Sequence, residues 1–305
     1  MPIIFVTIVN YNGEKDTLSC LKSLNEINAT GIKFNVIVLD NGSREIFNVD
    51  KGLYKNFKLF LIKSENNLGF AGGQNLAIKH ALVNGADYVV VLNNDVIADN
   101  NLLIELLQTF QDKSDCGLVS PKIYFAKGHE FHKDKYKENE LGNVIWYAGG
   151  EMDWRNVIGS HRGVDQVDTG QYDKVQETDF ASGCCVMIKK EVFERVGLFD
   201  ENYFLYYEDN DFSQRVKAKG FKIYYQPKAK LWHLNAGSAG GSGSLLQDYF
   251  ITRNRLLFGF KYSSTRARLA LLRESIKFVF TGRDLQKKAA FDFYMRRFGK
   301  GSYQL

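Results

Sequence analysis

The chain has 305 residues, of which 45% are hydrophobic and 25% are charged, and its formal net charge is +5. This length is sufficient for one sizeable domain with a large core and an appendage. No apolar stretch is long enough to cross a bilayer, and the first apolar run lacks a basic leader, so we expect neither a membrane span nor a signal peptide. The four cysteines lack C-x-x-C spacing and are predicted to lie in the core, which favours a reducing cytosol.

The first elements are predicted to alternate between buried strands and helices. Residues 3–9 are apolar and β-branched, which predicts a strand that ends in the polar turn 10–13, and an amphipathic helix is predicted at 14–27. A second strand at 34–39 ends at Asp40. An acid at a strand end can accept hydrogen bonds from a nucleobase or a ribose. A helix N-cap by the polar residues that follow is the structural alternative.

A glycine-rich turn at residues 66–75 is predicted between a strand at 57–62 and a helix at 76–83. Its glycines would let the backbone approach a ligand, and the start of the helix would offer N–H groups to an anion or a base. The spacing matches neither the dinucleotide fingerprint nor the P-loop. Tight packing of a loop explains the glycines equally well.

The strongest single signal is the apolar run Val89-Val90-Val91-Leu92, which is followed at once by Asn93-Asn94-Asp95. The run predicts a strand buried on both faces. Ligands of open α/β sheets bind beyond the carboxyl ends of the strands, so Asp95 is predicted at the rim of a site. There its carboxylate would hold Mg²⁺ or Mn²⁺, and the metal would hold a diphosphate. An Asx turn is the structural alternative.

A cluster of acids opens a later predicted helix. Glu208, Asp209 and Asp211 begin a helix that runs to Lys219 and stops at Gly220. The helix dipole stabilises acids in a first turn, which is the structural explanation. The aromatic pairs that precede them predict a cleft wall able to stack on a sugar ring, where a carboxylate would act as general base for a hydroxyl nucleophile.

Taken together, these segments resemble a family 2 glycosyltransferase with the GT-A fold, of the rhamnosyltransferase-like branch. The resemblance covers about residues 3–260 and is carried by seven motifs in order. They are residues 9–13, 40–43, 67–75, 93–95, 182–183, 208–209 and His233.

The resemblance implies an α/β fold with a mostly parallel, Rossmann-like central sheet flanked by helices. A GT-A catalytic domain would occupy residues 1–235, with a nucleotide-sugar half at 1–115 and an acceptor half at 116–235. A glycine-rich loop and C-terminal helices would follow at 236–305.

The resemblance also assigns roles to residues. Asp209 would be the catalytic base, and Asp95 and His233 would bind Mn²⁺ or Mg²⁺. The nucleotide sugar would contact Tyr11, Asn12, Asp40, Asn67, Gly72, Asn75, Asn94 and Arg253. The acceptor would contact Trp146, Ser182, Gly183 and Glu208.

There is one departure from the family pattern. The D-x-D motif reads Asn93-Asn94-Asp95, so one carboxylate is left to hold the cation. For His233, a satisfied histidine at a strand end, packed by Trp232, is the structural alternative.

The implied activity is inverting, metal-dependent transfer of a sugar in surface polysaccharide synthesis. The donor would be dTDP-rhamnose, with a UDP-hexose as the alternative, and the acceptor a hydroxyl of a saccharide or a lipid-linked saccharide. A catalytically silent nucleotide-sugar-binding or scaffold protein of the same fold is the competing class. A nucleotidyltransferase would need a basic, glycine-rich loop where residues 10–14 stand. Residues 247–255 match the Q-x-x-R-W element of processive synthases imperfectly, so a non-processive enzyme is expected.

The C-terminal residues 261–300 are basic, with apolar residues interleaved. Helices that cap the catalytic domain with a solvated basic face are the first interpretation. A helix pair lying on an anionic membrane, at the inner face of the plasma membrane, is the second. Nucleic-acid binding is not expected, because base-stacking and groove-reading modules are missing. The segment 236–244 is predicted to be a flexible linker or a loop that closes over the donor.

Overall fold

The computed structural model describes residues 1–235 and 244–304. The predicted linker or closing loop therefore lies outside the described residues, apart from Ser244, which caps the helix that follows. The four cysteines are buried free thiols, as predicted for core residues.

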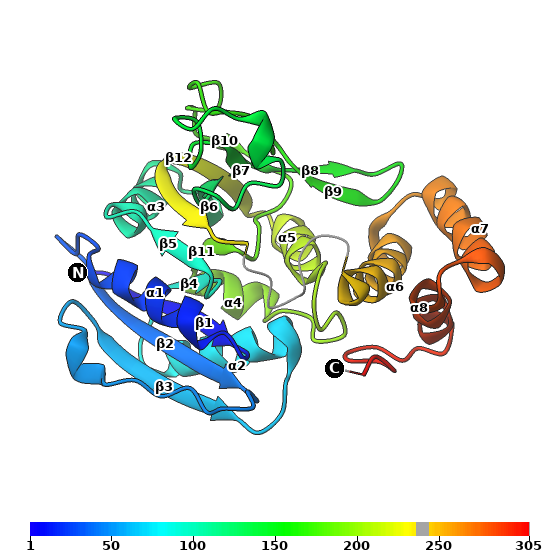
Figure 1. The fold of residues 1–305 in the computed structure, drawn as a ribbon, viewed down its shortest axis with the longest axis horizontal. Helices are drawn as coiled ribbons and strands as arrows, with labels where there is room; N and C mark the ends of the chain where they lie inside the picture. Colours follow the sequence, from blue (N-terminus) through cyan, green and yellow to red (C-terminus); the bar gives the residue numbers. More distant parts are fainter. Residues whose placement is uncertain (236–243, 305) are drawn as a thin grey trace.

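One large sheet forms the centre of the described molecule (Figure 1). In its first half, β1 (Ile3–Asn10), β2 (Lys33–Asn41), β3 (Lys58–Ser64) and β4 (Tyr88–Leu92) are parallel and lie in the order β3-β2-β1-β4. Because all four run the same way, the turns that follow β1, β2 and β4 meet at one edge of the sheet. The predicted strands are thus confirmed.

The second half of the sheet is mixed. β11 (Cys185–Lys189) runs antiparallel between β4 and β6 (Cys116–Phe125), and β12 (Lys222–His233) runs parallel to β6. Three short strands complete it: β5 (Val96–Ala98), β7 (Ile145–Tyr147) and β10 (Gln176–Glu177). A separate hairpin pairs β8 (Gly150–Asp153) with β9 (Ile158–His161).

The apolar strands supply two cores, one on each face of the sheet. Val90 and Leu92 of β4 belong to one core, and Val89 and Val91 to the other. Side chains alternate between the faces of a strand, so a strand covered on both sides is apolar at most of its positions. The mostly parallel sheet flanked by helices confirms the predicted fold class.

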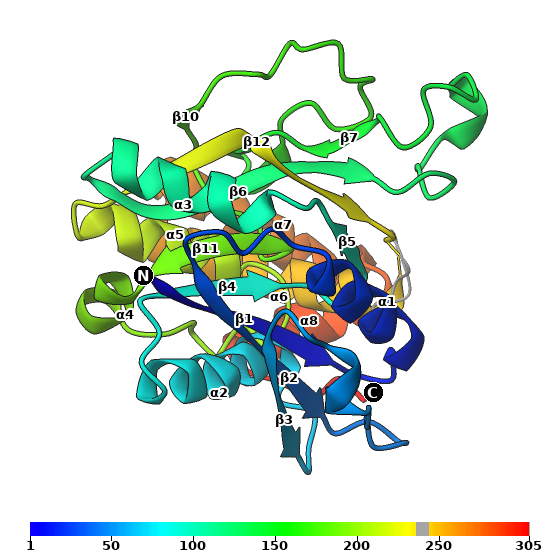
Figure 2. The ribbon, with the colours of Figure 1, turned by 90° about the vertical axis from the view of Figure 1, so that its left-hand side faces the viewer.

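Helices cover both faces (Figure 2). On one side lie α1 (Glu14–Asn25) and α3 (Leu102–Asp112); on the other lie α2 (Gly69–Val83), α4 (Lys190–Val196) and α5 (Glu208–Ala218). Two short 3₁₀ helices, η1 (Lys51–Leu53) and η2 (Lys133–Lys135), lie in loops.

Three C-terminal helices gather at one end of the molecule, away from β2 and β3 (Figure 1). They are α6 (Leu245–Tyr262), α7 (Thr265–Thr281) and α8 (Asp284–Tyr294), and α6 packs on both of the others. Within the described residues, no helix is both long enough and apolar enough to cross a membrane.

The start of α2 corrects one prediction. The helix begins at Gly69 and not at residue 76, so most of the predicted glycine turn is helical and buried. A Cβ atom at Gly73 would lie 3.1 Å from the Val9 side chain, so the glycine lets α2 pack closely on β1. The packing outweighs the low helix propensity of glycine.

Candidate active site

A cavity of about 700 Å³ opens at the carboxyl ends of the central strands. Its walls come from the turns after β1 and β4, the start of α5, the end of β12, and α6. Ten of the residues assigned roles from the sequence line it. They are Tyr11, Asn67, Asn94, Asp95, Trp146, Ser182, Gly183, Glu208, Asp209 and His233.

Asp95 and His233 meet on one wall of this cavity. Antiparallel pairing of β5 with β12 places Val96 opposite His233, so the two side chains come together from positions far apart in the chain. The Nε2 atom of His233 lies 3.1 Å from Oδ1 of Asp95, and both side chains are buried. The Trp146 ring packs edge-on against the imidazole at 4.7 Å, and Nδ1 of His233 has no hydrogen-bond partner among the described residues.

This pair suits a divalent cation that takes its other ligands from elsewhere. No group of three His, Cys, Asp or Glu side chains that could hold a metal occurs in the described part of the chain. A carboxylate oxygen and an imidazole nitrogen nevertheless converge at 3.1 Å on the cavity wall. Mg²⁺ is commonly held by one or two protein ligands together with substrate phosphates and water, so the residues present fit such an ion.

Asn94 has a structural task that an acid could not perform. Its side-chain amide donates to the carbonyl of Gly13 at 3.3 Å and to Oγ1 of Thr17 at 3.0 Å. A carboxylate has no proton to donate when ionised. The amide in the middle of the motif therefore ties the turn after β4 to the start of α1.

Asp209 and Glu208 stand side by side at the first turn of α5, in different environments. Oδ2 of Asp209 accepts a hydrogen bond from the Gly183 N–H at 3.0 Å, and its Oδ1 accepts two from Asn210. Burial raises the pKa of Asp209, and these hydrogen bonds oppose the rise. Burial, and the neighbouring charge of Asp209, hold the pKa of Glu208 well above its usual range. Oε2 of Glu208 has no hydrogen-bond partner among the described residues.

These environments favour different protonation states for the two carboxyl groups. Asp209 has the donors that stabilise a carboxylate, whereas Glu208 is better suited to carry a proton. Asp209 is therefore the stronger candidate for a general base.

The turn before α5 is strained and is held by α6. Phe204, Tyr206 and Tyr207 all have positive φ angles, between 64° and 71°, and all three line the cavity. Such conformations are sparsely populated by bulky side chains and persist only when the surroundings impose them. Asn254 of α6 holds the turn in this conformation. Its side-chain amide nitrogen lies 2.8 Å from the carbonyl oxygens of Tyr203, Leu205 and Tyr206.

The structure corrects the prediction for Arg253. Its side chain is fully buried and does not line the cavity. The guanidinium donates to the carbonyls of Asn202, Tyr203 and Arg297 and to the side chain of Asn254. Arg253 therefore supports the strained turn and is not placed to contact a nucleotide sugar.

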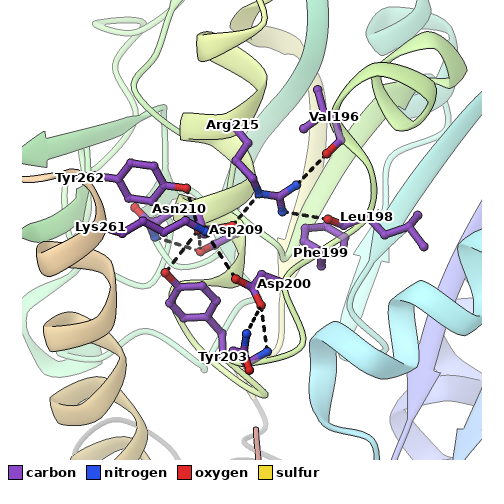
Figure 3. Close-up of polar contacts among 12 residues, drawn as sticks. Val196, Leu198, Phe199, Asp200, Tyr203, Asp209, Asn210, Arg215, Lys261 and Tyr262 are labelled. Atoms are coloured by element: carbon purple, nitrogen blue, oxygen red, sulfur yellow. Dashed lines mark hydrogen bonds and ion pairs between the residues drawn. The ribbon is translucent and has the colours of Figure 1, made fainter. Parts of the chain in front are cut away.

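Asp211, two residues after Asp209 on α5, anchors the helix to α6. It is fully buried and accepts hydrogen bonds from Nε of Arg215 at 2.7 Å, Nζ of Lys261 at 2.6 Å and the hydroxyl of Tyr262 at 2.8 Å. Figure 3 shows the side chains of Arg215, Lys261 and Tyr262 pointing toward one another from α5 and α6. The charged cluster fixes the first turns of α5 against the C-terminal helices.

Asp40 and Asn12, which were predicted to contact the nucleotide sugar, do not line the main cavity. Asp40 lines a separate cavity with Phe47, and its carboxylate accepts from the Phe47 N–H and from the Asn10 amide, each at 3.3 Å. The Asn12 N–H donates to Oγ of Ser43 at 2.9 Å, which ties the turn after β1 to the turn after β2.

Gly72 and Asn75 do not line the cavity, although Gly69, Phe70 and Gln74 of the same helix do. A Cβ atom on Gly72 would lie 3.0 Å from that of Leu68. The Asn75 side chain donates to the Phe199 carbonyl and to the Glu201 carboxylate, and accepts from the Phe199 N–H. Asn75 thus ties α2 to residues 199–201, which precede the strained turn.

Asn41, Arg255 and His161 are among the cavity residues to which the sequence assigned no role. Asn41 holds the start of α2 by donating to the Gly69 carbonyl at 3.0 Å. Arg255 pairs with Glu274 of α7 at 2.9 Å, and its place in an imperfect synthase-like motif is the sequence signal that could have identified it. Burial lowers the pKa of His161 to about 4. A single histidine in a hairpin gives no sequence signal.

Comparison with known proteins gives consistent matches. The family model described as "Glycosyl transferase family 2" matches residues 5–197, and one described as "N-terminal domain of galactosyltransferase" matches residues 170–235. The dTDP-rhamnosyl transferase RfbF of Shigella flexneri is 28% identical over 232 residues, which are 75% of this chain and 68% of the relative.

A second relative is the N-acetylglucosaminyl-diphospho-decaprenol L-rhamnosyltransferase of Mycobacterium tuberculosis, 24% identical over 219 residues, or 70% of each chain. Among solved structures, the mannosyltransferase PcManGT of Pyrobaculum calidifontis, in complex with GDP-Man and Mn²⁺, matches with a TM-score of 0.54 and 13% identity. The match covers 99% of this chain and 76% of that one. At this identity the match supports the shared fold alone.

Proposed function

Because the chain belongs to glycosyl transferase family 2, we propose that it transfers a sugar from a nucleotide-sugar donor to a hydroxyl of a glycan acceptor, with inversion at the anomeric carbon. One observation carries the proposal. A single cavity brings together an acid and an imidazole 3.1 Å apart, Asp95 and His233, and a buried, hydrogen-bonded carboxylate, Asp209.

On the acceptor side, Asp209 takes the proton from the attacking hydroxyl. The acceptor oxygen attacks the anomeric carbon on the face opposite the diphosphate, and the bond from that carbon to the diphosphate oxygen breaks as the new bond forms, so the configuration inverts. The Gly183 N–H and Asn210 fix the carboxylate, and burial makes it more basic than an exposed aspartate. Trp146, Ser182 and Glu208 complete the acceptor wall.

On the donor side, Tyr11, Asn67 and Asn94 line the part of the cavity at the strand ends. Asp95 and His233 would hold Mn²⁺ or Mg²⁺, which when bound supplies positive charge to the leaving diphosphate. The related proteins support this choice of partners: one is a dTDP-rhamnosyl transferase, one acts on a lipid diphosphate-linked sugar, and one structure holds Mn²⁺.

We favour dTDP-rhamnose as donor, with a hexose nucleotide as the alternative, and a saccharide or lipid-linked saccharide of a surface polysaccharide as acceptor. The silent binding or scaffold protein is the competing proposal. Both Asp95 and Asp209 line the cavity, which favours an enzyme over a binder.

A panel of nucleotide sugars, each with and without Mn²⁺, tests the function. The matching donor should raise the melting temperature, because a ligand at 100 times its Kd stabilises the native state by about 2.7 kcal/mol. The same donor should be consumed in a hydrolysis or transfer assay. Stabilisation by a donor without any turnover, across a set of saccharide and lipid-linked acceptors, would favour the silent binder.

The Asp95→Ala variant should lose the Mn²⁺-dependent part of donor affinity, because the variant lacks the carboxylate of the pair. His233→Ala should reduce the Mn²⁺-dependent donor affinity less than Asp95→Ala does, since a neutral imidazole attracts a cation less strongly than a carboxylate does. Donor titrations with Mn²⁺ and with EDTA measure both. Asp134→Ala, at an exposed acid of η2, is the control. Donor affinity that is indifferent to EDTA and to Asp95→Ala would exclude the cation at this place.

A further inference from the structure

The outward face of α7 combines apolar and basic side chains. Leu269, Ile276 and Phe280 recur at intervals of seven and four residues and are all exposed, and Phe280 is 76% exposed. Residues at such intervals share one face of a helix. Arg273 and Lys277 are also exposed and lie beside this stripe. Large apolar side chains gathered on one exposed helix face are typical of an interaction site.

The next helix, α8, adds to this surface. Phe291 and Met295 are each 53% exposed and lie one turn apart. Tyr294, between them, is linked to Ser275 of α7 by a hydrogen bond of 2.6 Å. We call this apolar set, Leu269, Ile276, Phe280, Phe291 and Met295, the α7–α8 surface.

The charge around the α7–α8 surface is almost all positive. Among residues 261–300 there are three acids, and two of them are engaged: Glu274 with Arg255, and Asp292, which is buried. No described acid forms an ion pair with the remaining basic side chains. These are Arg266, Arg268, Arg273, Lys277, Lys287, Lys288, Arg296 and Lys300.

The α7–α8 surface is one helix away from the cavity. Arg255 of α6 lines the cavity and pairs with Glu274 of α7 at 2.9 Å. On the cavity rim, Ile158 and Ile251 are exposed apolar side chains. A partner seated on α7 and α8 would therefore lie close to the side of the cavity that α6 forms.

We propose that the α7–α8 surface docks on an anionic lipid bilayer. Exposed aliphatic and aromatic side chains flanked by unpaired Lys and Arg match the chemistry of an interface between acyl chains and anionic headgroups. Docking would bring the cavity to an acceptor that is held in the membrane. That consequence rests on the proposed function, whereas docking itself rests on the surface alone.

Co-sedimentation of the full chain with vesicles tests the proposal. The chain should bind vesicles of phosphatidylglycerol and phosphatidylcholine at about 0.01 M ionic strength, where the Debye length is about 30 Å, and bind at least about tenfold more weakly at about 1 M, where it is about 3 Å. Vesicles of phosphatidylcholine alone should bind at least about tenfold more weakly than the anionic vesicles at low salt.

A paired variant locates the contact. Lys277→Glu/Phe280→Glu should lower binding to anionic vesicles at least about tenfold, because it reverses a charge and makes an apolar side chain acidic. Lys79→Glu/Val83→Glu is the matched control, since it makes the same change of character near the end of α2, where both residues are exposed. The control should bind like the wild type, and both variants should keep its melting temperature.

Three results would overturn the proposal: no binding of the wild type to anionic vesicles at low salt, equal binding of the wild type and the α7 variant, or a dimer in sedimentation velocity that only the α7 variant loses. The last result would make the surface an interface between copies. Vesicle binding needs neither donor nor acceptor, so its failure would leave the proposed sugar transfer untouched.

Discussion

Asp209→Asn should lower the turnover number at least about 100-fold while donor affinity stays near that of the wild type, because a positioned general base contributes at least about that factor. The amide keeps the size of the side chain and can still accept from the Gly183 N–H, but it cannot take a proton at neutral pH. Steady-state kinetics with the matching donor and acceptor, together with donor binding by thermal shift, measure both quantities.

Glu208→Gln is the matched control for this result. Burial favours the protonated form of Glu208, and glutamine resembles that neutral form, so most of the turnover should remain. Asp211 cannot substitute as base, because it is fully buried between Arg215, Lys261 and Tyr262. Turnover near the wild-type value in Asp209→Asn, with loss in Glu208→Gln, would move the base to Glu208.

The pH dependence of turnover should carry the same signature. Burial raises the pKa of Asp209 above the ordinary value of 3.8. Turnover should therefore fall as pH decreases through this raised pKa, at a higher pH than an exposed aspartate would give, since the protonated carboxyl cannot accept the proton. The residual activity of Asp209→Asn should lack this acidic limb.

Asp211→Ala should destabilise the native state by about 3 kcal/mol, because removal of one partner leaves the cations of a buried cluster without their counter-charge. Arg215 and Lys261 would lose the carboxylate between them, although their partial exposure lets water compensate in part. At about 2 °C per kcal/mol, the melting temperature should fall by about 6 °C, which differential scanning fluorimetry can resolve.

Glu194→Ala on α4 is the control for Asp211→Ala. Its carboxylate pairs with Lys190 at 3.6 Å, and both side chains are largely exposed, so the loss should be within about 0.5 kcal/mol. Equal melting temperatures for Asp211→Ala and the wild type would show that the cluster does not hold α5 against α6.

The sequence by itself determined the central strands and the acids that follow them. A strand covered on both faces is largely apolar, so β4 is visible as an apolar run and β1 as one interrupted only by Thr7 before its end. The abrupt change to polar residues marks the carboxyl end of each strand. Parallel order then brings Tyr11 and Asp95 to the same cavity. The start of α5 was also predictable, because acids in a first turn and a stop at Gly220 are local signals.

Contacts between distant segments decided the rest. The start of α2 depends on how closely its backbone packs on β1, which local propensity cannot show. Arg253 and Arg255 lie two positions apart on α6, about 200° around the helix axis, so one is buried under the strained turn and the other reaches the cavity. Which of them faces inward follows only from the docking of α6. His233 meets Asp95 because β12 pairs with β5, and that register is a property of the folded sheet alone.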